Sequence, residues 1–291
     1  MRKVALPQTP AGSWAADVSA LANASDAAFH SLVTPLASMT KLTYTATTGS
    51  YFNASELNAT VPGWQRDLNL TANPPAGMRA LFFYQPGTRR GVVAFRGTDL
   101  DHSTASGRAD ACADAILAND TLPPSCSREF SASTLDYWAR AVDFVAAAAT
   151  RHPELSLLFT GHSLGAQLAA MSAASRAPVG PAVAFSTPAW RDALANRTGR
   201  VPSSDTARGR LYALASKWDP VQARAVQEGG LVGDACYWDE PPAPGCETCF
   251  THGIPSTGPA CVLCFERTHI YAHYLHDLVP GPRPPCNASA P

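Results

Sequence analysis

Apolar side chains recur at helical spacing in two stretches of the chain, and each stretch predicts a helix. The first helix is expected over Ala15–Ala37, on the apolar residues Trp14, Val18, Leu21, Phe29 and Leu32. The second is expected over Ser133–Arg151, on Leu135, Trp138, Val142 and Val145. Both stretches place polar residues between the apolar ones, so each helix should bury one face against a sheet.

Short β-prone runs lie between and after these helices. Arg79–Tyr84 and Gly91–Arg96 are separated by Gln85-Pro86-Gly87-Thr88, a spacing that predicts a hairpin. Ala182–Ser186 and Arg210–Ala215 are expected to be buried strands. Together with the helices, these runs favour a layered α/β sheet in a single domain spanning residues 1–291.

The remaining segments carry less periodicity. Tyr51–Pro75 is polar and contains Pro62-Gly63, so it is expected to be a loop. Residues 103–127 are polar and alanine-rich, with little strand signal. Residues 234–268 are rich in Cys, Pro and Gly, which indicates a stapled insertion. The tail from Pro280 onward holds several prolines and is expected to be extended.

One motif in the chain points to acyl chemistry. Gly161-His162-Ser163-Leu164-Gly165 has the G-x-S-x-G pattern of a nucleophile elbow. A β-prone run, Leu155–Thr160, precedes it, and an alanine-rich helical run, Leu164–Ser175, follows it. A sharp strand-to-helix turn would expose the hydroxyl of Ser163, and the glycines would relieve crowding there. A structural Gly-rich turn is the competing interpretation.

An elbow serine needs an acid and a histidine later in the chain. Asp219 is the best candidate acid, because it directly follows the strand expected at Arg210–Ala215 and a carboxylate there can orient a histidine over the elbow. The later histidines are His269, His273 and His276. Physical reasoning separates them poorly, and spacing alone slightly favours His273.

Several segments resemble the fungal-type triacylglycerol lipases, the class 3 lipase family of the α/β-hydrolase superfamily. The elbow, Trp218-Asp219-Pro220-Val221 and Ile270-Tyr271-Ala272-His273-Tyr274 resemble its segments for the nucleophile, the acid and the histidine. Two further segments resemble that family's oxyanion loop and its F-G-S-P segment: Val92–Thr98 and Phe185-Ser186-Thr187-Pro188. The resemblance covers about residues 80 to 278 and implies that His273 is the base.

The resemblance also implies an oxyanion hole. One donor would be the backbone N–H of Leu164, the residue after the nucleophile. The other would be Thr98, which follows Arg96-Gly97, through its N–H and its hydroxyl. The alternative for each residue is a purely structural role: Thr98 could be an ordinary threonine at a strand end, and Leu164 could serve only in packing.

The chain also departs from the family pattern. The segment over residues 103–127 is expected to be the lid, yet Ala109–Asn119 contains no aromatic residue, and its larger apolar residues are Ile116 and Leu117. Such a lid would expose little hydrocarbon on opening, so we expect weak interfacial activation. The alternative that the protein is an esterase acting on small soluble esters therefore stays open.

The charge balance narrows the partners. The chain has 22 basic and 23 acidic residues in no long runs, which disfavours nucleic acid as a partner. No apolar run approaches the length of a membrane span. The partners we expect are an ester or lipid substrate and a transient lipid interface, and the protein is expected to be a monomer without a cofactor.

Asparagine usage indicates a secreted glycoprotein. Seven of the eight asparagines lie in N-x-S/T sequons, and Asn73, which precedes Pro74, is the exception. Chance in a chain rich in Ser and Thr is the alternative explanation. Pro7 and Pro10 interrupt any signal-peptide core near the start, so we expect that a leader was removed from this chain.

The eight cysteines agree with secretion. An even count in that setting predicts disulfides, and Cys112 and Cys126 are paired here because they flank a short loop. Cys246-x2-Cys249 and Cys261-x2-Cys264 would indicate zinc in a cytosolic chain, but seven sequons favour disulfides. The pairing of the other six cysteines stays open.

These observations predict a secreted, lipase-like serine ester hydrolase. Ser163, Asp219 and His273 would form its triad, with Thr98 and Leu164 in the oxyanion hole and no metal. The alternatives are a feruloyl-type esterase or a phospholipase on the same fold, and a hydrolase fold used only for binding.

Overall fold

The computed structural model describes residues 14–45, 54–119, 121–242, 244–249 and 259–288. Eight strands in these residues form one sheet, whose spatial order follows the order along the chain. They are β1 (Gln65–Ala72), β2 (Ala80–Gln85), β3 (Arg90–Phe95), β4 (Ser156–His162), β5 (Ala182–Phe185), β6 (Leu211–Ser216), β7 (Asp234–Trp238) and β8 (Cys286–Ala288). Neighbours from β3 to β7 are parallel, and the outer pairs β1/β2, β2/β3 and β7/β8 are antiparallel. The predicted α/β-hydrolase sheet is therefore confirmed.

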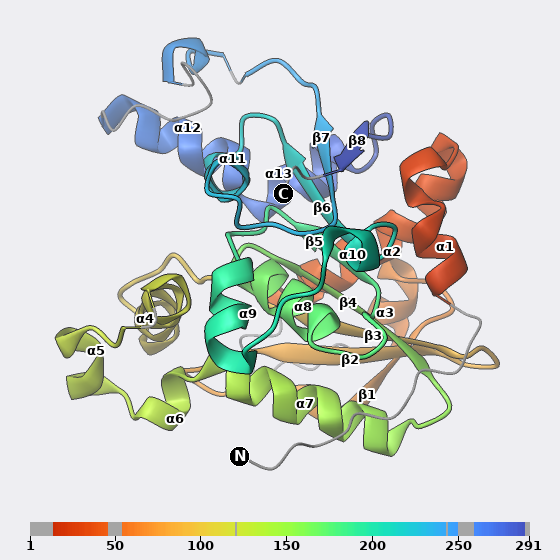
Figure 1. Ribbon diagram of the computed structural model, residues 1–291, viewed down its shortest axis with the longest axis horizontal. Helices are drawn as coiled ribbons and strands as arrows, with labels where there is room; N and C mark the ends of the chain where they lie inside the picture. Colours follow the sequence, from red (N-terminus) through yellow and green to blue (C-terminus); the bar gives the residue numbers. More distant parts are fainter. Residues whose placement is uncertain (1–13, 46–53, 120, 243, 250–258, 289–291) are drawn as a thin grey trace.

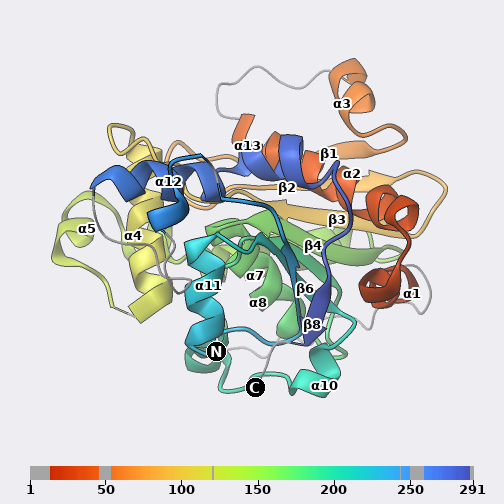
Figure 2. The same ribbon diagram turned by 90° about the horizontal axis from the view of Figure 1, so that it is seen from above.

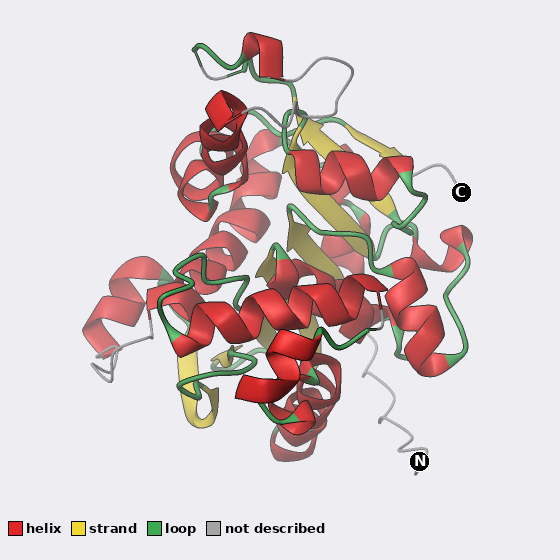
Figure 3. Cartoon of the chain, turned by 90° about the vertical axis from the view of Figure 1, so that its left-hand side faces the viewer, coloured by secondary structure: helices red, strands yellow, loops and turns green. Residues whose placement is uncertain are grey.

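Helices cover both faces of this sheet (Figures 1 and 2). Those described are α1 (Ala15–Ser19), η1 (Leu21–Asn23), α2 (Asp26–Thr45), α3 (Ala54–Thr60), α4 (Ala105–Asn119), α5 (Pro124–Glu129), α6 (Ala132–Leu135), α7 (Tyr137–Arg151), α8 (Leu164–Ala174), α9 (Arg191–Thr198), α10 (Ser204–Ala207), α11 (Pro220–Gln227), α12 (Pro259–His269), α13 (Tyr271–His273) and η3 (Tyr274–Leu278). Figure 3 shows how these helices enclose the strands.

Alternating strand residues divide the interior into two cores. On β2, Leu81 and Phe83 pack with α1, α2 and η3, whereas Phe82 packs with α7 and α8 on the other face. Successive side chains of a strand point to opposite faces, so a central strand that is covered on both sides must bury all its side chains, either as apolar groups or as hydrogen-bonded polar ones such as Thr160. Every residue of β4 is buried, as this argument requires.

Both predicted long helices are divided by a capping residue. The stretch Ala15–Ala37 breaks at η1, and the Ser25 hydroxyl accepts a hydrogen bond from the Ala28 N–H (3.3 Å) where α2 begins. The stretch Ser133–Arg151 breaks at Asp136, whose carboxylate accepts from the Ala139 N–H (3.1 Å) at the start of α7. Such side chains compete with the helical hydrogen bonds and favour a new N-terminus.

The loop predicted over Tyr51–Pro75 is wrong for its described residues, which form α3 and the edge strand β1. Asp67 on β1 is buried because it pairs with Arg151 and accepts a hydrogen bond from His152 (2.9 Å), both from the end of α7. Both partners lie more than eighty residues further along the chain, so the sequence around β1 did not show that its polar Asp67 could be buried in a strand. The predicted hairpin is confirmed as β2 and β3.

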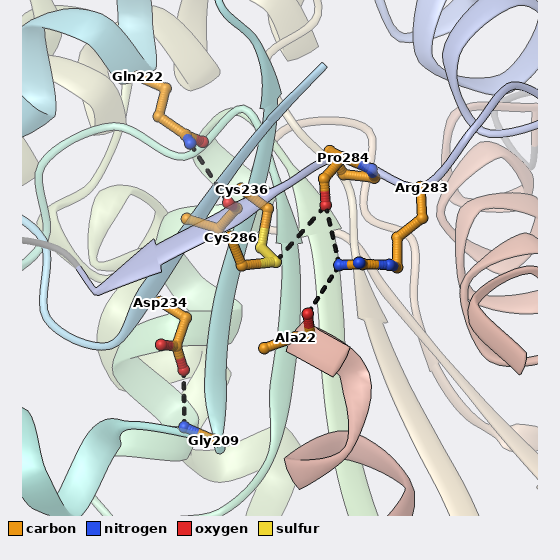
Figure 4. Close-up of a disulfide and its surroundings, with 9 residues drawn as sticks. Ala22, Gly209, Gln222, Asp234, Cys236, Arg283, Pro284 and Cys286 are labelled. Atoms are coloured by element: carbon orange, nitrogen blue, oxygen red, sulfur yellow. Dashed lines mark hydrogen bonds between the residues drawn. A yellow bond between two sulfur atoms is a disulfide. The ribbon is translucent and has the colours of Figure 1, made fainter. Parts of the chain in front are cut away.

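Four disulfides join all eight cysteines. Cys112–Cys126 links α4 to α5, as predicted. Within residues 234–268, the pairs Cys246–Cys264 and Cys249–Cys261 confirm the disulfide crosslinking, but Asp234–Trp238 are not part of an insertion because they form β7 of the sheet. Figure 4 shows the fourth, Cys236–Cys286, which holds the last strand against β7. None of the described helices has the length and apolar character needed to cross a membrane.

Candidate active site

Ser163 lies at the sharp turn between β4 and α8. Its φ is 55°, and its N–H donates to the Phe185 carbonyl of the neighbouring strand (3.0 Å). Two glycines allow the turn to pack this closely: a Cβ at Gly161 would lie 2.4 Å from backbone atoms of Gly165, and one at Gly165 would lie 2.4 Å from the Phe95 carbonyl oxygen. The elbow conformation predicted from the sequence is present.

His269, at the end of α12, faces this serine. Its Nε2 lies 3.0 Å from Ser163 Oγ, and its Nδ1 lies 3.0 Å from Asp219 Oδ2. The imidazole therefore bridges a hydroxyl and a carboxylate. A histidine held in this way can accept the proton of the hydroxyl, while the carboxylate fixes its tautomer and stabilises its charged form.

Asp219 is fully buried and precedes α11. Its Oδ1 accepts from the N–H of Val221 (2.9 Å), and its Oδ2 accepts from the hydroxyls of Ser186 and Tyr274. Burial by itself would raise the pKa of this carboxyl. The charge of His269 and the hydrogen bonds from His269, Ser186 and Tyr274 outweigh that effect and lower the pKa to about 2. The carboxylate therefore stays ionised at neutral pH.

His273 lies outside this constellation, which contradicts its predicted place in the triad. Its Nε2 lies 2.9 Å from Glu240 Oε1, and its Nδ1 lies 2.9 Å from Asp277 Oδ2. Both ring nitrogens are thus occupied by carboxylates. His273 lies four residues after His269, but α12 ends at His269 and the extended backbone of Ile270 (ψ 138°) interrupts the helix before α13, so the two side chains reach different partners. The position of Asp277, four residues after His273, is the sequence signal for such a pairing.

A hydrogen-bonded chain links His269 to the elbow and to the segment after β3. His162 Nε2 lies 2.7 Å from the carbonyl oxygen of His269, and its Nδ1 lies 2.9 Å from the Tyr44 hydroxyl. That hydroxyl accepts from the Gly97 N–H (3.1 Å). Burial and the nearby His269 lower the pKa of His162 to about 3, so its ring is neutral. A neutral ring can donate to the carbonyl and accept from Tyr44 at the same time.

Sequence reasoning missed the roles of Tyr44, His162, Ser186 and Tyr274. Ser186 stands where the lipase-like F-G-S-P segment has glycine, and its φ is 51°. A non-glycine residue with positive φ is uncommon, and such residues gather at functional sites. Ser186 Oγ also lies 2.7 Å from His269 Nδ1, so it contacts both the acid and the histidine. The Ser-for-Gly exchange was the one available signal.

The two residues predicted for the oxyanion hole flank the elbow. Thr98 follows the loop after β3, and its hydroxyl donates to Asp114 Oδ2 on α4 (2.7 Å). Burial raises the pKa of Asp114 to about 7 despite this hydrogen bond. Leu164 is the first residue of α8, where the leading N–H groups lack acceptors inside the helix. Its side chain is fully buried, so the packing role is real as well.

Two clefts meet at Ser163 and His269. We call the first the Arg79 cleft: it has a volume of about 820 Å³ and is lined by Lys41, Tyr44, Arg79, Asp99, Thr104 and Ile270 among others. We call the second the Asp192 cleft: it has a volume of about 660 Å³ and is lined by Asp114, Gln167, Asp192, Val221, Arg224 and Glu228 among others. Thr98 and Leu100 border both clefts. An ester that spans the serine can place one arm in each.

No group of three or more His, Cys, Asp or Glu side chains in the described ranges is arranged to hold a metal. The four cysteines with zinc-like spacing are consumed by Cys246–Cys264 and Cys249–Cys261. The disulfide interpretation of that pattern is therefore confirmed.

Comparison with known proteins gives one family. The model of "Lipase (class 3)" matches residues 92–189, which run from β3 through the elbow to the segment after β5. This part of the chain is therefore similar to class 3 lipases. The resemblance inferred from the motifs is confirmed, and with the fold it supports an ester hydrolase of lipase type. No curated protein matches the chain.

Solved lipase structures have a similar but distant fold. A lipase from Rhizopus microsporus var. chinensis is 19% identical, with a TM-score of 0.42 over 82% of this chain and 80% of that one. Lipase II from Rhizopus niveus is 18% identical, with a TM-score of 0.47 over 74% and 82%. The LIP2 lipase of Yarrowia lipolytica is 13% identical, with a TM-score of 0.44 over 72% and 80%. These values are too low to transfer a substrate to this chain.

Proposed function

We propose that this class 3 lipase-like protein is a secreted serine carboxylic-ester hydrolase that works through an acyl-enzyme on Ser163. The observation that carries the proposal is the bridge of His269 between Ser163 Oγ and Asp219 Oδ2, each 3.0 Å away. A protein that used the fold only for binding would have no need of this buried, fully hydrogen-bonded arrangement.

The proposed reaction has two halves. Ser163 Oγ attacks the ester carbonyl while His269 Nε2 takes its proton, and the tetrahedral intermediate expels the alcohol as His269 returns that proton. Water then attacks the acyl-enzyme with the same histidine as base and releases the carboxylic acid. Asp219 stabilises the imidazolium in both halves. The N–H groups of Thr98 and Leu164 are the proposed donors to the oxyanion, and Asp114 fixes the Thr98 side chain.

Release of p-nitrophenol from p-nitrophenyl butyrate tests this proposal directly. We expect steady turnover by the wild-type protein, and a phosphonate ester should label Ser163 and stop it. Absence of turnover on short p-nitrophenyl and glyceryl esters would favour the binding-protein alternative.

Secretion and glycosylation belong to the same proposal. Four disulfides are typical of proteins that fold in an oxidising compartment. Four sequon asparagines are exposed and accessible to glycan transfer: Asn23, Asn58, Asn69 and Asn196. Mass spectrometry of protein secreted from eukaryotic cells should find glycans on these four. Unmodified asparagines at all of them would contradict this part.

Residues 103–127 remain the proposed lid. Their helix α4 borders both clefts, through Ser106 on one and Leu117 on the other. Leu117 is buried, and Ile116 is partly buried, so opening would expose little apolar surface. At about 25 cal/mol per Å², an oil surface would stabilise the open state only weakly. We expect appreciable hydrolysis of tributyrin below its solubility limit. No measurable hydrolysis below that limit would contradict this expectation of weak interfacial activation.

A further inference from the structure

Arg79 has an unpaired charge inside the molecule. This residue directly precedes β2, and only 7% of its surface is exposed. Its Nε and Nη1 atoms are buried and have no hydrogen-bond partner. Guanidinium groups that leave water are normally paired with carboxylates or with ligand anions, because an unpaired buried charge is costly. An anion outside the protein chain would satisfy this group.

The nearby acid cannot serve as that partner. Asp110 pairs with Arg96 and also accepts hydrogen bonds from the Tyr137 hydroxyl and the Asp99 N–H (2.9 Å). Burial raises the pKa of Asp110, which weakens it as a counter-charge. Burial and the neighbouring Arg96 in turn lower the pKa of Arg79. Two buried arginines thus share one carboxylate whose oxygens are already engaged.

Arg79 borders the Arg79 cleft, on the same cavity as Ser163. The first residues of α4 border it too, and the N-terminal N–H groups of a helix attract anions. Lys41 and Arg96 are the other positive side chains of the lining, with Arg96 paired to Asp110 behind it, and Asp99 is the acidic side chain among the described lining residues. The cleft therefore has an excess of positive charge.

The Asp192 cleft has the opposite balance. Arg224 and Glu228 line it as a pair (2.7 Å), Asp114 is only partly ionised at neutral pH because burial raises its pKa to about 7, and Asp192 adds a further carboxylate, so the lining has an excess of negative charge. An anionic group on a substrate would be repelled there and attracted to the Arg79 cleft. The two clefts give a charged ester one favoured orientation across Ser163.

We propose that the Arg79 cleft binds a phosphate group carried by the ester substrate, with Arg79 as the residue that recognises it. This inference rests on the proposed function, because it assigns a substrate class to the same site. The phosphate keeps all its bonds, and hydrolysis breaks only the acyl carbon–oxygen bond at Ser163. Free phosphate offers the same chemistry, so the tests separate a substrate headgroup from a free anion.

The first test measures binding without turnover. Thermal unfolding is followed in inorganic phosphate and in chloride of equal ionic strength for wild type, Arg79→Met and the control Arg89→Gln, an exposed arginine in the β2–β3 turn. A ligand that binds only the folded state raises Tm. We expect phosphate to raise the Tm of wild type and the control but not of Arg79→Met. An equal rise in Arg79→Met would overturn the site. If Arg79→Met does not fold, Arg79→Lys replaces it and should keep part of the phosphate-induced rise in Tm. A Lys variant that shows no rise, or the full wild-type rise, would count against recognition of phosphate by the charge of Arg79.

The second test measures specificity. Monomeric dihexanoyl glycerophosphate is compared with neutral dihexanoylglycerol below the solubility limit of both. The ratio of kcat/KM for the anionic over the neutral ester should fall at least about tenfold in Arg79→Met, the usual effect of losing a charged hydrogen bond, and stay unchanged in Arg89→Gln. An unchanged ratio with a phosphate-dependent Tm would overturn the substrate role. If wild type hydrolyses no ester yet phosphate still raises Tm through Arg79, the proposed function fails while the anion site stands.

Discussion

The elbow, residues 156–174, and the histidine segment, residues 259–279, are held in place by different means. The elbow lies at the centre of the sheet, and glycine packing at Gly161 and Gly165 fixes its backbone. The histidine segment begins within the Cys-rich segment, since α12 carries Cys261 and Cys264. It is fixed by the disulfides Cys246–Cys264 and Cys249–Cys261 and by the hydrogen bond between His162 and the His269 carbonyl. Local backbone geometry therefore positions the proposed nucleophile, whereas crosslinks and side-chain contacts position the proposed base.

Removal of the nucleophile should have the largest effect. Ser163→Ala should lower kcat on p-nitrophenyl butyrate by three orders of magnitude or more, since loss of a triad member typically costs this much. The elbow backbone does not depend on the hydroxyl, so Tm should stay close to that of wild type. Near-normal turnover in this variant would show that the elbow is structural.

Exchange of the histidines tests the other half of the comparison. His269→Ala should be as damaging as Ser163→Ala, and the double variant should add little because the two groups act as a unit. His273→Ala is the matched control, four residues away, and should keep most activity because its ring contacts Glu240 and Asp277 instead. The reverse result would return the role of base to His273.

Removal of one disulfide in the histidine segment should lower both stability and activity, and so distinguish this segment from the elbow. Replacing both Cys246 and Cys264 by serine removes a crosslink over 18 residues, a change that typically costs about 3 kcal/mol of stability. We expect kcat to fall as well, because His269 ends the helix that carries Cys264. The matched control removes Cys236–Cys286, which joins β7 to β8. It should lower Tm as well, but kcat should fall less. Both variants are assayed at a temperature below the Tm of either. Equal falls in kcat would show that the histidine does not depend on its local crosslink.

The smallest effect concerns pH. Burial lowers the pKa of His273, but its hydrogen bonds to Glu240 and Asp277 outweigh burial and leave the pKa raised. A raised folded-state pKa contributes stability that is fully present below the unfolded-state value, about 6.5, and lost as pH rises through the folded-state value. His273→Gln should therefore lower the free energy of unfolding, and with it Tm, more at about pH 5 than at about pH 9. The difference between the two pH values should be under about 1 kcal/mol, because the pair is partly exposed. A difference that grows with pH would contradict this sign.

The same contrast explains what could be predicted from the sequence. The elbow and the β2–β3 hairpin depend on nearby residues, such as Gly161, Gly165 and Gly87, so their patterns were readable. β1 was not readable, because its buried Asp67 depends on Arg151 and His152. Asp219, the proposed acid, follows the end of β6, where the order of the predicted elements placed it.

The base needed information that the sequence does not carry locally. His269 and His273 are only four residues apart, and the carbonyl contact with His162, the bond to Asp219 and the pairing of Glu240 with His273 decide between them. All three contacts join residues more than thirty positions apart. Resemblance to the lipase family located the correct segment and selected the wrong histidine within it.

Labelling of Ser163 by a p-nitrophenyl phosphonate tests the central claim, that His269 activates this serine, most directly. The rate of nitrophenol release and the labelled peptide are measured for wild type, His269→Ala and His273→Ala. Our account predicts one equivalent of label on Ser163 at similar rates in wild type and His273→Ala, and a rate lower by orders of magnitude in His269→Ala. Undiminished labelling in His269→Ala, or its loss in His273→Ala, would contradict the account.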